Sequence, residues 1–133
     1  MRRLLGTLAV LLVLPGCGDD TRSSVPPPPR TPGVMLVHAT AGRGDAEPRA
    51  TDVTDPADLT AYVEPFSDDL AAKVTKAVGE VDGETILAQV VSVGCDVPPG
   101  AHVRGDDIVA AKVVAPTEEC FAPVTTVAVA GVD

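Results

Sequence analysis

The sequence predicts an α+β fold, in which a small, mostly antiparallel sheet of about four strands carries two short helices on one face. Three observations lead to this prediction. The 133 residues leave room for one domain, two helix-start signals lie in the middle of the chain, and valine-rich runs of strand length fill its C-terminal half. A small β-sandwich is the alternative arrangement.

The first strand is expected at 34–37, where apolar residues follow one another without interruption. Residues 39–54 are polar and punctuated by glycine and proline, so this stretch is expected to be a loop. The folded domain is therefore predicted to begin near Val34 and to continue to the end of the chain.

Each of the two helices has a start signal and a stop signal. Asp55 offers a capping carboxylate before Pro56, a residue suited to the first helical position, and Pro65 interrupts the helical spacing of apolar residues that follows. Ser67 can cap the second helix, and Gly79 marks its end. Both segments are amphipathic, so each is expected to lie on the sheet.

The remaining strands are expected at 85–94, 108–115 and 124–132, which are rich in valine and separated by turn-forming residues. Three consecutive strands with short connections favour an antiparallel meander. Their core must be built mainly from small branched side chains, because the chain holds no tryptophan, one tyrosine and two phenylalanines.

The N-terminus has the features of an export signal. Arg2 and Arg3 give it a positive start, and an apolar run at 4–14 follows. That run is too short to cross a hydrocarbon core of roughly 30 Å, which takes about 20 residues. We interpret it as the hydrophobic region of a cleaved signal peptide.

The residues after this run indicate the kind of signal. Leu14-Pro15-Gly16-Cys17 resembles the lipobox of bacterial lipoprotein precursors, with leucine three residues before the cysteine and glycine directly before it. The resemblance implies that residues 1–16 are a lipoprotein signal peptide, that a diacylglycerol is attached to the thiol of Cys17, and that cleavage falls between Gly16 and Cys17. Pro15 departs from the small or hydroxylated residue usual at its position. The alternatives are a plain secretory signal cut near Gly16 or Gly18, and a short helix buried in the core.

Residues 17–33 are predicted to form a spacer between the lipidated Cys17 and a single domain at 34–133. The stretch contains a run of prolines at 26–29 and offers no apolar face to bury. Proline-rich chain is extended, at about 3.1 Å per residue, so it would hold the domain away from the bilayer. The predicted location is therefore the cell membrane, with the protein lipid-anchored on its extracytoplasmic face.

The two remaining cysteines, Cys95 and Cys120, are predicted to form a disulfide, because export delivers this pair to an oxidising compartment. The functional alternative is a cysteine- or histidine-based enzyme, or a metal-handling protein, that uses these cysteines with His38, His102 or Met35. The cysteines lack the short C-x-x-C spacing of redox pairs, and both histidines lie next to turns, where a solvated imidazole is expected. No metal site, cofactor or catalytic residue is therefore predicted.

Two segments that contain these cysteines, GCDVP at 94–98 and ECFAPVTTV at 119–127, resemble the C-terminal part of small lipoproteins of high-GC bacteria. The absence of asparagine and the preference for arginine over lysine agree with such a source. The resemblance implies a small extracytoplasmic domain with the Cys95–Cys120 disulfide, and it assigns no functional site.

Charge limits the partners that the protein can have. The formal net charge is −9, and it becomes more negative once Arg2 and Arg3 leave with the signal. Such a charge argues against nucleic acid and against unaided binding to an anionic membrane, so the membrane is expected to hold the protein through its lipid. The predicted function is that of a non-enzymatic, membrane-tethered cell-envelope lipoprotein whose small domain binds another envelope protein or a ligand.

Overall fold

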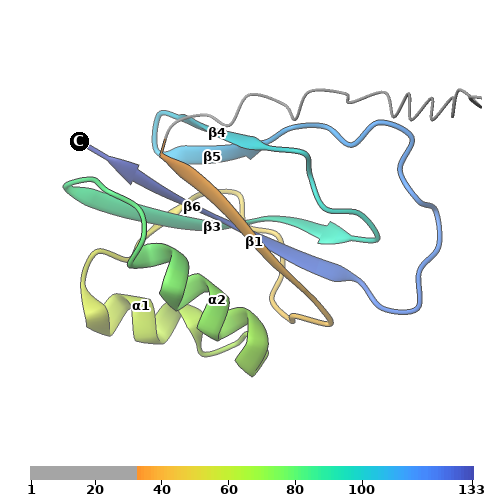
Figure 1. The fold of residues 1–133 in the computed structure, drawn as a ribbon, viewed down its shortest axis with the longest axis horizontal. Helices are drawn as coiled ribbons and strands as arrows, with labels where there is room; N and C mark the ends of the chain where they lie inside the picture. The colour runs from red at the N-terminus through yellow and green to blue at the C-terminus, as the bar shows by residue number, and fades with distance from the viewer. Residues whose placement is uncertain (1–32) are drawn as a thin grey trace, which may run out of the picture.

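A four-stranded antiparallel sheet lies between two helices on one face and a β-hairpin on the other (Figure 1). The computed structural model describes residues 33–133. In chain order the elements are β1 Val34–Thr40, β2 Thr51–Asp52, α1 Pro56–Val63, α2 Asp68–Val78, β3 Thr85–Gly94, β4 Ala101–Arg104, β5 Asp107–Ala110 and β6 Val124–Val132. The predicted α+β class, with a small antiparallel sheet and two helices, is confirmed.

The sheet has the strand order β1-β6-β3-β2, so β6 has β1 and β3 as its two neighbours. All of its strand pairs are antiparallel. The longest pairing joins β3 to β6 from Thr85↔Val132 to Gly94↔Val124, with a bulge between Val90 and Ser92. Because β6 is buried on both faces over most of its length, it is a nearly continuous run of valine, alanine and threonine.

The predicted meander is wrong, because 108–115 does not lie in this sheet. Only Asp107–Ala110 of that region is strand, and it forms a separate hairpin with β4, which the sequence did not predict. Both edges of β6 are already occupied by β1 and β3, and the side chain of Lys112 is exposed. A longer strand there would have neither a partner nor an apolar surface to cover. The fourth strand of the sheet is instead the short β2, inside the stretch predicted as a loop.

Both predicted helices are confirmed, and their caps are visible. The Asp55 carboxylate accepts a hydrogen bond at 2.8 Å from a backbone N–H of the first turn, and Pro56 is the first residue of α1. The Ser67 hydroxyl accepts a hydrogen bond from the N–H of Leu70 at 3.4 Å, and Gly79 follows the last residue of α2. Local chemistry therefore fixes where these helices begin and end.

Two apolar clusters occupy the two faces of the sheet. Successive residues of a strand point to opposite faces, so Val127 and Val129 of β6 face the helices while Ala128 and Ala130 face the hairpin. The helix side also buries Tyr62, Phe66, Leu70, Val74 and Ala77, and the hairpin side buries Ala101 and Ile108. The small alanine side chains let the hairpin lie close to the sheet.

Buried Gln89 ties the hairpin to the sheet. Its side chain is on the hairpin face of β3, opposite Ala128, and the residue is 5 % exposed. Its Oε1 accepts a hydrogen bond from the N–H of Ile108 at 2.7 Å, and its Nε2 donates to the carbonyl oxygen of Glu47 at 2.9 Å. Both ends of the amide are thus satisfied, as a buried polar group requires.

Candidate functional site

A disulfide closes the end of the sheet at which β3 ends and β6 begins. Cys95 directly follows β3, Cys120 precedes β6, and their Cα atoms are 5.5 Å apart. The bond spans a sequence separation of 25, which contains the whole β4–β5 hairpin. The predicted pairing is confirmed. A crosslink that closes a loop of this length contributes about 3.5 kcal/mol in the chain-entropy model.

A second contact closes the same segment beside the disulfide. The Asp96 carboxylate accepts two hydrogen bonds from Thr117, one from its N–H at 2.6 Å and one from its hydroxyl at 2.9 Å. Such paired bonds to a carboxylate are stronger than neutral ones. One covalent and one hydrogen-bonded crosslink therefore attach Cys120 and Thr117 to the end of β3. Both residues belong to residues 111–123, which we call the disulfide loop.

The disulfide loop presents apolar side chains to solvent. It runs as a long arc from β5 to β6, beyond the end of the sheet and away from the helices (Figure 1). The side chain of Phe121, next to Cys120, is fully exposed, and Val114 is 90 % exposed. The other two aromatic residues, Tyr62 and Phe66, are buried in the core. Phe121 is therefore the one aromatic side chain of the domain that the fold itself does not use.

The backbone and charge of the disulfide loop are also unusual. Ala115 has a φ of 53°, in the left-handed region that residues other than glycine rarely adopt. Glu118 and Glu119 lie exposed just before the disulfide. The loop thus combines exposed apolar side chains with two exposed carboxylates, and its backbone has a rare conformation at Ala115.

A polar contact on the helix side of the sheet joins Glu47 to Tyr62. Oε2 of Glu47 accepts hydrogen bonds from the Tyr62 hydroxyl at 2.9 Å and from the N–H of Val90 at 2.7 Å. Burial raises the pKa of Tyr62, and the negative charge of Glu47 raises it further. The hydroxyl therefore remains a donor, and the contact fastens the chain between β1 and β2 to the sheet.

The structure does not gather the candidate metal ligands around one point. His38 is exposed on β1, while Met35 packs against the helix-side cluster on the opposite face of the same strand. His102 is exposed on β4. The sulfurs of Cys95 and Cys120 are bonded to each other, so neither offers a thiolate. Within residues 33–133, no group of three or more histidine, cysteine, aspartate or glutamate side chains could hold a metal ion.

The predicted lipobox lies outside the described residues, and so do the lipidation of Cys17, the cleavage between Gly16 and Cys17, and most of the spacer at 17–33. In the part of the chain that the structure describes, neither helix has the length and apolarity that a membrane crossing requires.

Sequence reasoning missed two features of this site, the exposure of Phe121 and the Asp96–Thr117 contact. A signal for the first was present, because Phe121 stands in a polar stretch between Pro116 and Pro123. No local signal pointed to the second, since Asp96 and Thr117 meet only after the chain folds back.

No protein-family model matches this chain, and no match was found among the curated proteins or the solved structures.

Proposed function

We propose that this protein is a membrane-tethered cell-envelope lipoprotein without enzymatic activity, and that its domain binds another envelope protein through the disulfide loop. The observation that carries the proposal is Phe121, whose side chain is fully exposed in a loop held by two crosslinks. A chain with so few aromatic residues places two in its core and the third in water. Exposed aromatic side chains of this kind are typical anchors of protein interfaces.

Docking of Phe121 would remove a large apolar area from water. An aromatic side chain buries about 150–250 Å², which corresponds to roughly 4–6 kcal/mol before the costs of association are subtracted. The disulfide and the Asp96–Thr117 contact hold the loop before binding, so less conformational entropy is lost on association. The loop is thus suited to carry a binding anchor.

The surroundings of Phe121 indicate the chemistry of the partner. Glu118 and Glu119 are exposed close to it in sequence. Complementary charges across an interface favour encounter and set the register of docking. We therefore expect an apolar pocket that takes the phenyl ring, bordered by lysine or arginine side chains.

The proposed lipid anchor would hold this domain at the membrane. The positive start, the apolar run at 4–14 and the motif that ends in Cys17 together support lipidation. A single acyl chain gives only marginal membrane binding, whereas two or three give a stable anchor, and an acidic protein gains nothing from anionic lipid. The spacer at 17–33 would then present the domain to partners near the membrane.

Photo-crosslinking in intact cells tests the interface. A photoreactive phenylalanine analogue at Val114 is expected to crosslink to one partner protein, and Phe121→Ser in the same chain is expected to lower the yield. The matched control places the analogue at Glu64, which lies at the C-terminal end of α1 in the helix layer. Equal yields from positions 114 and 64, or a yield that Phe121→Ser leaves unchanged, would contradict the proposed interface.

Metabolic labelling with a clickable palmitate analogue tests the anchor. The full chain is expected to take up the label and to fractionate with membranes. Cys17→Ser should abolish the label and either release the protein or leave it uncleaved, whereas Gly18→Ala, which keeps the cysteine, should retain it. Label that persists in the Cys17→Ser variant would overturn the lipidation.

A further inference from the structure

β1 is an edge strand, because only β6 pairs with it in the described sheet. The carbonyl of Gly33 accepts from the N–H of Gly131, and the N–H of Ala41 donates to the carbonyl of Pro123. Odd-numbered residues therefore direct their backbone groups toward β6. In an antiparallel ladder this direction alternates along the strand, so the even-numbered residues direct theirs outward. These residues are Val34, Leu36, His38 and Thr40.

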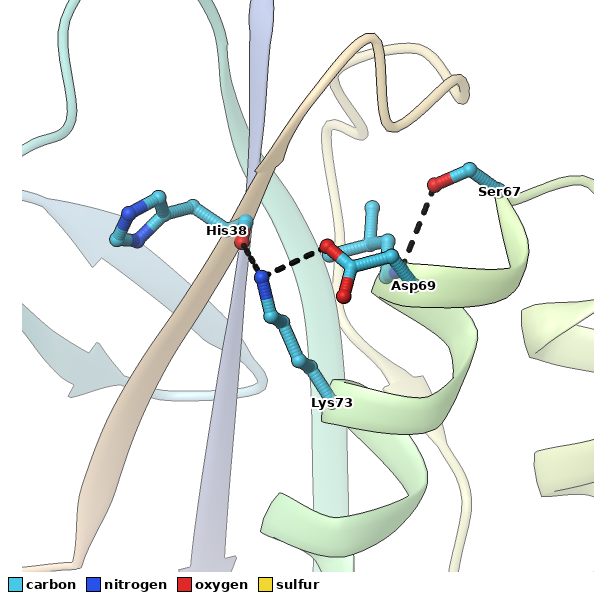
Figure 2. Close-up of polar contacts among 5 residues, drawn as sticks. His38, Ser67, Asp69 and Lys73 are labelled. Carbon is cyan, nitrogen blue, oxygen red and sulfur yellow. Dashed lines mark hydrogen bonds and ion pairs between the residues drawn. The ribbon is translucent and has the colours of Figure 1, made fainter.

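Lys73 covers one of the outward carbonyl groups. Figure 2 shows its side chain reaching from α2 to β1, where Nζ donates to the backbone oxygen of His38 at 3.0 Å and pairs with Asp69 at 2.7 Å. Lysine is a common means of protecting a sheet edge from unwanted pairing. No other residue of 33–133 provides such a bond to Val34 or Leu36. Among the described residues, Lys73 thus covers the edge at His38, whereas the edge at Val34 and Leu36 is open.

A pocket of about 460 Å³ lies beside the open part of the edge. It is lined by Gly33, Val34 and Met35 at the start of β1 and by Glu80, Val81 and Asp82 after α2. Glu80 and Asp82 are exposed carboxylates, and within residues 33–133 Glu80 has only a long contact of 3.7 Å with Lys76, while Asp82 has no ion pair. The pocket therefore combines apolar walls with negative charge.

We propose that an extended segment of another protein, carrying a lysine or arginine, adds to the edge of β1 at 34–36 and places that basic side chain between Glu80 and Asp82. In strand addition, main-chain hydrogen bonds supply affinity, and alternate side chains that enter pockets supply specificity. A second copy of this chain suits the site less well, since each copy has a net charge of −9. This site is separate from the disulfide loop and does not depend on it.

Peptide binding to the mature chain, with Cys17→Ser in place of lipidation, tests the proposal. A short peptide of alternating valine and lysine is expected to bind, as measured by fluorescence anisotropy. A valine and glutamate peptide should bind on the order of tenfold more weakly or not at all, because its charge repels the pocket. In an added strand, every second residue directs its backbone N–H toward β1. N-methylation of alternate amides of the basic peptide can therefore follow two patterns, and the pattern that methylates the amides facing β1 should abolish binding.

Protein variants locate the binding. Glu80→Gln with Asp82→Asn is expected to lower affinity for the basic peptide on the order of tenfold. Asp58→Asn with Glu64→Gln removes the same charge from exposed positions of α1 and its C-cap, and it should leave affinity unchanged. Equal losses in the two variants, or equal binding of both peptides, would overturn the proposal. A concentration-dependent dimer would also overturn it, because a second copy would then be the occupant. The same holds if Arg30→Ser by itself shifts the amide resonances of Val81 and Asp82, because the chain's own preceding segment would then be the occupant.

Discussion

Buried polar side chains in this domain differ in how well they are satisfied. The amide of Gln89 is bonded at both ends, and the hydroxyl of Tyr62 donates to Glu47. The hydroxyl of Thr126 is fully buried on the hairpin face of β6, and it has no hydrogen-bond partner among the described residues. A buried polar atom without a partner keeps its desolvation cost without compensation. These side chains therefore give opposite expectations for substitution.

Replacing Thr126 with valine is expected to raise the free energy of unfolding by about 1 kcal/mol, because valine has nearly the same shape and removes the unbonded hydroxyl. Chemical denaturation of both proteins measures the difference. Thr126→Ala is the control, and it should destabilise because it opens a small cavity in the hairpin-side core. A loss of stability in the valine variant would show that the hydroxyl has a bonding partner after all.

The raised pKa of Tyr62 predicts how the free energy of unfolding changes at high pH. Its folded-state pKa is raised by burial and by the charge of Glu47, above the ordinary value of about 10 that applies in the unfolded chain. This contribution to stability is therefore complete below about pH 10 and is lost as the pH rises above that value. Because Tyr62 is the only tyrosine, the absorbance of tyrosinate reports it alone. The denatured chain should titrate near pH 10, and the native chain should titrate at a higher pH. Tyr62→Phe should remove the pH dependence of stability, and titration of the native tyrosine near pH 10 would contradict this prediction.

The sequence predicted those secondary-structure features that depend on residues close together in the chain. Asp55, Ser67 and Gly79 act within one turn of their helices, so both helices could be placed in advance. Strand pairing is different, because it depends on which edges remain free after the chain has folded. The run at 108–115 has the composition of a strand, yet β6 already pairs with β1 and β3. The four-residue β4 carried too short a pattern to predict.

Some features of the candidate site could likewise be predicted from the sequence, whereas others depend on the folded chain. The predicted export signal and an even pair of remaining cysteines were enough to predict the Cys95–Cys120 bond. The exposure of Phe121 could not be read from its apolar type, because such residues are usually buried. The outward backbone groups of β1 depend on its place at the edge of the sheet, which a strand pattern does not reveal.

The two hydrogen bonds of the Gln89 side chain are expected to contribute to the attachment of the hairpin to the sheet. Gln89→Leu would leave the N–H of Ile108 and the carbonyl of Glu47 without their present partner, so we expect a loss of about 2 kcal/mol or more in unfolding free energy. Hydrogen exchange should show the amide of Ile108 losing protection before the amides of β6. His102→Leu, on the exposed side of β4, serves as the control and should change neither quantity. Unchanged protection of Ile108 in Gln89→Leu would refute this role.

The helix layer and the hairpin layer are attached to the central sheet by different interactions. The helix layer rests on the larger core, which includes Tyr62, Phe66 and Leu70. The hairpin layer buries mainly Ala101 and Ile108 against the sheet, so it gains less from apolar burial. The disulfide and the Asp96–Thr117 contact compensate by holding both ends of the segment that carries the hairpin. The hairpin layer should therefore depend on the crosslink more than the helix layer does.

Cys95→Ala and Cys120→Ala are each expected to lower the melting temperature, and the double variant should cost about as much as either single one, because all three lose the same crosslink. A loss of about 3.5 kcal/mol is readily measured, since 1 kcal/mol moves the midpoint of a domain this size by about 4–8 °C. Amides of β4 and β5 should lose protection before those of α2. Equal melting with and without reductant would contradict a structural bond. Two free thiols in the native protein would return Cys95 and Cys120 to the alternative of a cysteine-based enzyme or metal-handling protein.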